Sequence, residues 1–447
     1  MAAVNLSSVG IAPESSYGSV DSSTGVPSNG ALSFVQLDYD RANAAALYSN
    51  LDEPAAEAIE ARTAFGEAPA EPVTLWQSAA PVQRLAGSIE LSGHVIGVGD
   101  GSVVSDHSGL PLAMIVRSIL GGQMPNAASD SITGVSSSTF TPTTATNYFE
   151  GMLVAVSING RREISRVVDV DTGTPLITVA PAFSAVPGTQ DVRLMTTFFP
   201  DEELSRWITG ARGAESTSTA TSFALRGDIG LGSDARRVEA FGCRATRLRM
   251  FSDDSRVVGW EATIDVPYAT DDGLTATLQS PVWGANPRPN KAVYMGALAT
   301  LSDDIGTGSV GATLPRSTLN VRNGWELVIE GTRSASDVNG ETILGQSESE
   351  LVDVQIRFNC SVDSTAVLED MRRDTERRML TIGTGPDLVG CGIGIQIPAA
   401  HLIDYAQPTE NDARFVLGLS FAADQFNLDN RTTGYADNRV LAIGFAR

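Results

Sequence analysis

The sequence predicts a mainly β protein, with two tandem β-sandwich or half-barrel domains that each carry one helix, plus a small inserted all-β domain. Three observations lead to this fold class. Apolar and polar residues alternate in several segments, helical periodicity is scarce, and a similar order of elements occurs twice along the chain. A chain of 447 residues is long enough to hold several such domains.

Period-two alternation is the strongest local signal. It runs through the segments 88–95, 258–266, 352–362 and 415–421. Alternation of this kind is typical of strands that bury one face and leave the other in water, which is common in antiparallel sheets. We therefore expect mainly antiparallel pairing, with apolar side chains on the inner face of each strand.

Helical patterns are few. One helix is expected over 107–120, where Gly121-Gly122 provides a stop signal. A second is expected over 364–380, with acids toward its start and arginines toward its end, as the helix dipole favours. Two short helices are expected over 42–47 and 201–208.

The order of elements suggests an internal duplication. In both halves an alternating strand is followed by a helix, a Gly-Cys pair and an Asp-x-Arg turn. The Gly-Cys pairs are Gly242-Cys243 and Gly390-Cys391, and the turns begin at Asp254 and Asp412. The duplication predicts a discontinuous first domain over 31–125 and 201–285 and a second domain over 286–447.

The excess length in the first half predicts an insertion over 126–200. Strands are expected at 152–156, 164–170, 176–179 and 192–195. Asn159-Gly160 is a type I′ hairpin signal, and Gly173-Thr174-Pro175 indicates another turn. The pattern favours a small barrel or a sheet of four to five strands. The Ser/Thr-rich stretch 129–146 is expected to be a linker.

The ends of the chain and its cysteines bound the cellular context. Residues 1–30 are rich in Ser, Gly, Ala and Pro and predict an arm that could pack on a neighbouring subunit. The start has no basic, apolar signal segment, and no apolar run reaches the length of a membrane helix. Cys243, Cys360 and Cys391 lie in apolar strand patterns, where they are expected to be small core residues.

The charge balance excludes some partners. The chain has 31 Lys and Arg residues, of which only Lys291 is a lysine, against 53 Asp and Glu residues, and its net charge is −22. Phosphates would be repelled, so binding to nucleic acid or anionic membrane by charge is not expected. The acidity is either a device for solubility or the lining of a channel along which DNA slides without adhering.

The search for catalytic or metal-binding motifs is mostly negative. His94, His107 and His401 are far apart, and Asp106-His107 is better read as a helix start than as a catalytic dyad. The glycines at 97–101 lack a Walker lysine. The segment 169–173 lacks the downstream bidentate Glu at position 12 of a calcium loop and favours a hairpin turn. We therefore expect no enzyme activity, no cofactor and no metal.

Several segments together resemble the long, duplicated type of siphophage major tail tube protein. The first is 221–269, which contains Phe241-Gly242-Cys243-Arg244. The others are 317–325, 350–371 and 392–405. The resemblance covers most of 80–125 and 221–447, and it gives the two expected domains a tail-tube-like fold. It also implies that residues 126–200 form an extra domain on the outer surface of the tube.

The resemblance implies a structural role in the virion. Three chains would form a pseudo-hexameric ring, and stacked rings would form the hollow tube through which phage DNA passes. Its partners would be further copies of itself, the tape measure, the tail terminator and the distal tail protein, with no membrane binding by this chain. The candidates for lumen-facing residues are Glu261, Asp265, Asp353 and Gln355. The alternatives are a capsid decoration or baseplate protein and, less favoured, a particle-borne carbohydrate-active enzyme.

Overall fold

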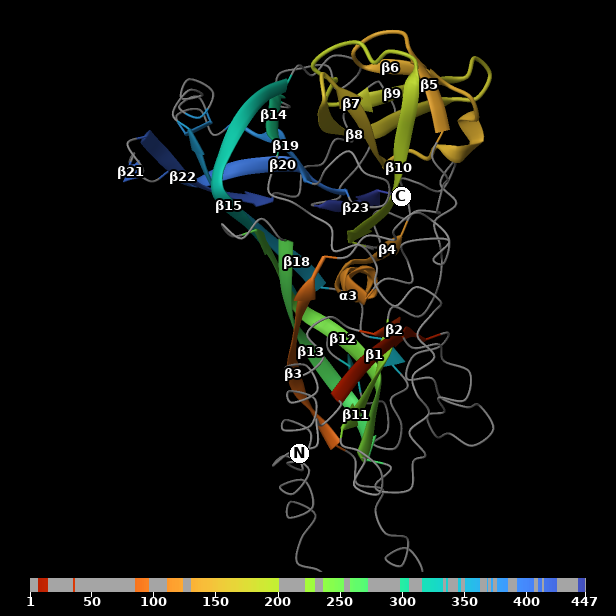
Figure 1. Ribbon diagram of the computed structural model, residues 1–447, viewed down its shortest axis with the longest axis vertical. Coiled ribbons are helices and arrows are strands. Elements are labelled where there is room, and N and C mark those ends of the chain that lie inside the picture. The colour runs from red at the N-terminus through yellow and green to blue at the C-terminus, as the bar shows by residue number, and fades with distance from the viewer. Residues whose placement is uncertain are drawn as a thin grey trace, which may run out of the picture.

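The protein is mainly β, as the alternation predicts (Figure 1). The computed structural model describes residues 7–14, 35–36, 85–95, 111–123, 130–200, 222–229, 236–252, 258–271, 298–304, 316–332, 335–336, 345–346, 350–361, 368, 371–372, 376–384, 392–405, 409–411, 414–423 and 441–446. The expected short helices at 42–47 and 201–208, together with His107 and Cys391, lie outside these ranges.

A long antiparallel sheet runs through both halves of the chain. Its strands, in spatial order, are β3 (Leu85–His94), β13 (Val258–Asp271), β12 (Arg236–Ser252), β15 (Arg316–Thr332), β18 (Glu350–Ser361) and β22 (Arg414–Ala423). The strands predicted from alternation are β3, β13, β18 and β22. The contact between β12 and β15 joins strands of the predicted first domain to strands of the predicted second domain.

Further strands cover the buried side of this sheet. On the first half these are β1 (Ser7–Pro13), β2 (Val35–Gln36) and β11 (Phe223–Ile229), which pair in the order β2–β1–β11–β12. On the second half these are β14 (Leu298–Asp304), β19 (Arg378–Thr384), β20 (Ile393–Tyr405) and β23 (Ala442–Ala446). The strands β14, β15, β18, β22, β20 and β19 pair in a closed cycle.

Two small pairings complete the described strands. β21 (Thr409–Asn411) pairs with the start of β22. β16 (Ala335–Ser336) pairs with β17 (Gly345–Gln346).

The N-terminal arm predicted at 1–30 contains β1, which pairs with β11 and β2 of the same chain. Glu14 follows β1 and is buried. Its carboxylate accepts hydrogen bonds from the Ser222 hydroxyl and, at 3.0 Å, from the backbone N–H of Gly242. Gly242 has φ +70°, which glycine adopts without strain. This part of the arm is therefore held within its own chain.

The helix α3 (Pro111–Leu120) confirms the predicted helix over the described part of 107–120. Almost all of it is buried in the core that the long sheet shares with β1 and β11. The Ser118 hydroxyl accepts a hydrogen bond of 3.0 Å from the N–H of Ala245 in β12. Gly121, with φ +93°, ends the helix and begins β4 (Gly121–Gln123), in agreement with the predicted stop.

The second predicted helix is too long at its C-terminal end. Leu368, Met371 and Arg372 are helical, and the first two are buried. Residues from Arg378 onward form β19 instead, which pairs with β14 and β20. Pairing on both sides buries the side chains of Leu380 and Ile382, and this overrides the local helical pattern.

Residues 130–200 contain a closed six-stranded barrel. Its strands are β5 (Asp130–Gly134), β6 (Thr139–Pro142), β9 (Leu176–Ala180), β8 (Arg161–Asp171), β7 (Leu153–Ile158) and the first part of β10 (Gln190–Pro200), paired in that order and closed by β10 with β5. The barrel encloses a hydrophobic core of its own. The short 3₁₀ helix η4 (Ala145–Asn147) follows β6. The predicted hairpin at Asn159-Gly160 is confirmed, since both residues have positive φ.

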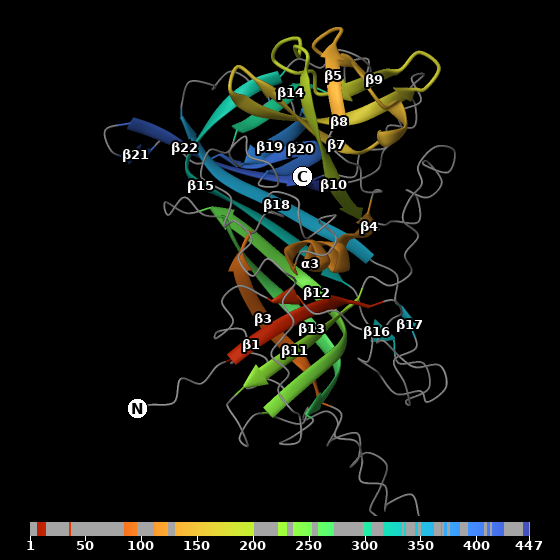
Figure 2. The same ribbon diagram turned by 45° about the vertical axis from the view of Figure 1, so that its right-hand side comes forward.

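The linker predicted at 129–146 is wrong, because β5 and β6 lie in it. Ile132 and Phe140 point into the barrel core and are almost fully buried. The residues next to them in sequence are Ser and Thr. The segment therefore has the composition of a linker, although its residues alternate as in a strand. The second part of β10 leaves the barrel and pairs with β23 and β4, so the barrel continues directly into the rest of the fold. In both views the barrel lies at one end of the molecule and α3 near the middle (Figures 1 and 2).

Two β-bulges recur at matching places in the two halves. The first bulge lies between β11 and β12, where the register partners change from Phe223–Cys243 to Leu225–Ala240. Its counterpart lies between β19 and β20, where the register partners change from Arg378–Ala400 to Leu380–Ile397. In this register, Cys243 of β12 and Ala400 of β20 occupy equivalent positions in the two halves. The pairs Gly242-Cys243 and Gly390-Cys391 are therefore not equivalent in this register, although the order of elements is the same in the two halves.

The second bulge lies two residues further along β12 and β20. Its register partners are Ala245–Ile264 and Arg247–Thr263 between β12 and β13, and Leu402–Phe421 and Asp404–Ser420 between β20 and β22. The extra residue is Thr246 in one half and Ile403 in the other. By this register, Asp404 occupies in the second half the position that Arg247 occupies in the first.

Candidate functional site

One face of the long sheet is polar along its whole described width, and we call it the polar face. Apart from Arg244, which is buried opposite Asp265, its described charged side chains are Glu90, Glu261, Asp265, Glu326, Glu330 and Asp353, together with Arg247, Arg249 and Arg357. Every one of them is exposed or half-buried. The alternate residues of the same strands point into the hydrophobic core with α3. The sheet therefore separates a wet surface from a dry one.

The four candidates for lumen-facing residues all lie on the polar face. Glu261 and Asp265 come from β13, and Asp353 and Gln355 come from β18. The two pairs are separated by β12 and β15. The Gln355 Nε2 donates a hydrogen bond of 3.3 Å to the Asp353 carboxylate. Sequence reasoning placed these residues in phase, and the pairing of the strands brings them onto one surface.

Sequence reasoning missed the arginines that lie between the candidates. Arg249 of β12 contacts Glu261 of β13 at 2.9 Å and Glu326 of β15 at 2.5 Å. These carboxylates raise the pKa of the Arg249 guanidinium, chiefly through hydrogen bonds from Glu326 and Glu261. The guanidinium also lies over the ring of Phe251, 4.4 Å from its centroid. One arginine therefore links three neighbouring strands.

A second ion pair crosses the same strand junction. Arg247 of β12 contacts Glu330 of β15 at 3.1 Å. Glu330 lies directly opposite Asp353 on β18, an arrangement in which two like charges repel. Arg247 is exposed and long, so it supplies positive charge at the one place where acids face each other across the described strands of the polar face. On the polar face, the backbone pairing of β12 with β15 is thus accompanied by ion pairs between β12 arginines and β15 glutamates.

Asp265 differs from the other acids of the polar face. It lies opposite Arg244 in the ladder between β12 and β13 and is half-buried. Burial raises the pKa of the Asp265 carboxyl, and the charge of Arg244 opposes that rise. Its carboxylate therefore contributes less to the exposed negative charge than Glu261 does.

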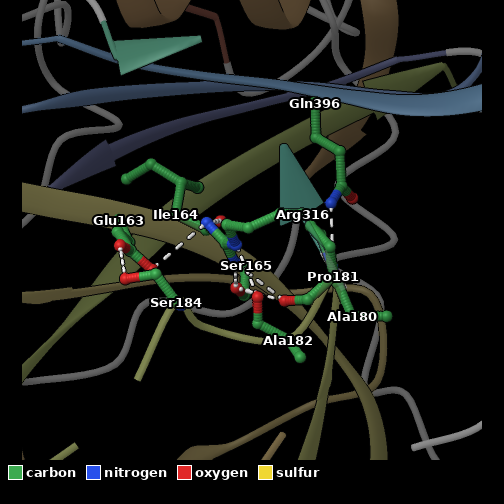
Figure 3. A network of polar contacts seen from close by, with 9 residues as sticks. All are labelled: Glu163, Ile164, Ser165, Ala180, Pro181, Ala182, Ser184, Arg316 and Gln396. Atoms are coloured by element: carbon green, nitrogen blue, oxygen red, sulfur yellow. Dashed lines mark hydrogen bonds and ion pairs between the residues drawn. The ribbon is translucent and has the colours of Figure 1, made fainter. Parts of the chain in front are cut away.

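Arg316, at the start of β15, joins the barrel to the rest of the fold through a network of polar contacts (Figure 3). Its guanidinium donates to the carbonyls of Ala182, of Pro181 at 2.8 Å and of Ile164 at 3.3 Å, and to the Ser165 hydroxyl. The carboxylate of Glu163 lies 3.6 Å away and accepts hydrogen bonds from the N–H and hydroxyl of Ser184. Both charged side chains are almost fully buried.

Burial lowers the pKa of Arg316 to about 10, and Glu163 opposes the shift. Sequence reasoning had no signal for this network, because its donors and acceptors are far apart along the chain. Its effect is mechanical, since it ties β15 to the barrel strand β8 and to the segment that follows β9.

Glycines let the barrel approach the second half closely. An added Cβ on Gly383 would lie 2.9 Å from Ile164, and one on Gly444 would lie 2.8 Å from Met195. Ile164 belongs to the barrel strand β8, and Met195 lies where β10 leaves the barrel. With Arg316, these contacts hold the barrel in a fixed orientation.

The far edge of the long sheet is formed by Ile403–Tyr405 of β20 and continued by β21. Both pair with β22 on one side, and no strand in the described ranges pairs with them on the other. The side chain of Ile403 is 51% exposed, one of three large apolar side chains exposed to this degree in the described parts of the chain. We call this segment the open edge.

Of the histidines considered for catalysis, the structure describes two, and they lie on strands of different halves of the chain. His94 is on β3 and His401 on β20. Within the described residues, no group of three or more His, Cys, Asp or Glu side chains could hold a metal ion. Cys243 and Cys360 are buried, and burial raises the pKa of both thiols, that of Cys360 to about 11.

The segment 169–173 forms a hairpin turn, as predicted. The Asp171 carboxylate accepts hydrogen bonds from the N–H of Gly173 at 2.8 Å and of Thr174 at 3.1 Å. An open hollow of about 610 Å³ lies beside this turn and is lined by Ala145, Thr146, Tyr148, Phe149, Glu150, Asp169, Val170, Asp171 and Thr172.

No protein-family model matches the chain, and a search of curated proteins finds no relative. Among the helices that the structure describes, none is long and apolar enough to cross a membrane.

Proposed function

We propose that the chain is the structural subunit of a siphophage tail tube, in which it associates with copies of itself into stacked rings around a DNA channel. The observation that carries the proposal is the long sheet. It has a polar face and a buried face, it joins both halves of the chain at β12 and β15, and it ends at the open edge.

The proposal includes two tandem tail-tube-like domains. The two recurring bulges support this duplication, because they match β11, β12 and β13 to β19, β20 and β22, and the order of pairing extends the match to five strands in each half. The order β1–β11–β12–β13–β3 corresponds to β14–β19–β20–β22–β18. If each half contributes one sixth of a ring, three chains make a pseudo-hexameric ring. The domain limits expected from the sequence, 31–125 with 201–285, and 286–447, are part of this proposal.

The polar face would line the lumen in this arrangement. Its exposed and half-buried charged groups are six carboxylates and three guanidiniums, and Arg244, opposite Asp265, is buried, so a wall built from it carries net negative charge. Phosphates of passing DNA would be repelled and would find no continuous basic surface to bind. Glu261 and Asp353, both exposed, are the strongest candidates for this role, while the Asp265 side chain is half-buried.

The barrel would lie on the outside of the tube. It contacts β19, β20 and β23, which cover the buried side of the long sheet, and it does not contribute to the polar face. The rest of the proposal follows from the tail-tube assignment: a location in the virion, and contacts with the tape measure, tail terminator and distal tail protein.

Self-association tests the proposal. We expect sedimentation velocity and native mass spectrometry of the purified chain, measured over a concentration series, to show species in multiples of three chains. A closed oligomer with another stoichiometry would favour a capsid decoration or baseplate role. A chain that remains monomeric at every concentration would contradict self-assembly.

A further inference from the structure

The junction between β12 and β15 shows how two halves of this fold join within one chain. Residues Arg247–Ser252 of β12 pair antiparallel with Trp325–Glu330 of β15. On the polar face the junction is closed by the ion pairs of Arg247 with Glu330 and of Arg249 with Glu326. Backbone pairing and charge complementarity therefore act together at this edge.

The open edge in the second half corresponds to the edge of β12 that pairs with β15 in the first half. The second bulge places Ile403 in the position of Thr246 and Asp404 in the position of Arg247. In both halves the strand that follows the bulge lies beside the next strand of the long sheet, β13 or β22. In the first half its other side pairs with β15, while no described strand fills the same place in the second.

The chemistry of the two edges is opposite. The first half presents an arginine to a glutamate of β15, whereas the second half presents the exposed carboxylate of Asp404. A β15 strand docked on the open edge would bring Glu330 next to Asp404, and the two like charges would repel. The exposed side chain of Ile403 adds apolar surface that an edge strand does not normally leave in water.

We propose that the open edge, Ile403–Tyr405 with Thr409–Asn411, is where a second copy of the chain adds a strand, and that Asp404 selects a strand carrying a basic side chain at the facing position. This inference rests on the proposed function, since it names the edge at which neighbouring chains of a ring meet. Strand addition to an exposed sheet edge is an established mode of recognition, with backbone hydrogen bonds for affinity and side chains for register. The internal junction supplies the geometry, and the reversed charge disfavours a partner edge that carries a glutamate at the facing position.

The variant Asp404→Arg tests the inference. It inverts the charge of an exposed side chain, so the fold should be retained. We expect the concentration needed for half-maximal assembly to rise by about tenfold or more. Asp404→Asn, which removes the charge only, should give a smaller rise. Ile403→Thr, which introduces the residue found at the equivalent position 246, is a second variant that acts without any change of charge and should also weaken assembly.

The matched control is Asp169→Arg. This exposed aspartate lies on the barrel, away from the open edge, and the same charge change there should leave assembly unchanged. Circular dichroism and thermal unfolding of each variant verify the fold. If the wild type assembles and Asp404→Arg and Ile403→Thr assemble at the same concentration, the assignment of this edge is wrong while the tube proposal stands. If the wild type forms no rings or tubes at any concentration, the proposed function fails first.

Discussion

Arg249 of β12 and Glu326 of β15 form an ion pair of 2.5 Å across the strand junction that joins the two halves of the chain. The same arginine also holds Glu261 of β13, so its guanidinium spans three strands of the polar face. This arrangement allows a surface with excess negative charge to remain locally paired where the halves meet. It also gives the junction a side-chain pattern that experiments can alter without touching the core.

Replacing Arg249 by Ala should cost little stability. The side chain is about one-third exposed, and ion pairs of this kind contribute less than about 1 kcal/mol after screening by solvent. We expect a decrease of that size in the free energy of unfolding, measured by urea titration, and a smaller decrease at high salt. In a double-mutant cycle with Glu326→Gln, a coupling energy indistinguishable from zero would show that the pair does not stabilise the junction.

The buried pair of Arg316 and Glu163 should behave differently. Arg316→Ala leaves the Glu163 carboxylate buried without its cation, and loss of one partner of a buried pair costs about 3–5 kcal/mol. The double variant Arg316→Met/Glu163→Gln removes both charges and should recover part of the loss. The measurement is thermal and urea unfolding of the three proteins. A single variant as stable as the wild type would show that the network does not hold the barrel in place.

Overpacking at the contact between the barrel and the second half should also destabilise the fold. Gly383→Ala places a methyl group 2.9 Å from Ile164, and such overpacking costs about 1–3 kcal/mol. Gly188→Ala is the matched control, because no atom lies within 4 Å of its added Cβ. Unfolding curves of both variants check the prediction. Equal stability of the two would mean that the barrel can shift away without loss.

Asp265 predicts a specific dependence of stability on pH. Burial raises its pKa in the folded state, so the folded protein binds this proton more tightly than the unfolded chain does. Ionisation of this carboxyl therefore lowers the free energy of unfolding as the pH rises from the unfolded-state pKa, about 4, to the higher folded-state pKa. Asp265→Asn lacks this loss, so its stability relative to the wild type should increase as the pH is raised from about 3 through that interval. A constant difference over that range would contradict the shift.

The strands of the long sheet could be predicted because alternation is a local property. The segments around Ile89, Trp260, Ile356 and Phe421 alternate, and each forms a strand with its apolar residues in the core. The strands β5 and β6 were missed because their outward residues are Ser and Thr, which resemble a linker in composition. The helix expected to reach Leu380 stops earlier because pairing with β14 and β20 decides the conformation there.

The candidate site was predictable only in part. The phase of Glu261, Asp265, Asp353 and Gln355 could be read from alternation, and this phase places them on one face. Their neighbours Arg247 and Arg249 could not be identified, because which strand lies beside β12 depends on the contact with β15, far along the chain. The open edge likewise depends on which strands remain without a partner. Pairing over long sequence distances, which local patterns do not encode, determines both features.

Electron microscopy of the assembled protein tests the central claim most directly. We expect negative-stain images, followed by a reconstruction, to show hollow tubes or three-chain rings with six similar lobes, with the polar face toward the central hole and the barrel outside. Closed particles of another symmetry, or rings in which Glu261 and Asp353 face outward, would contradict the account.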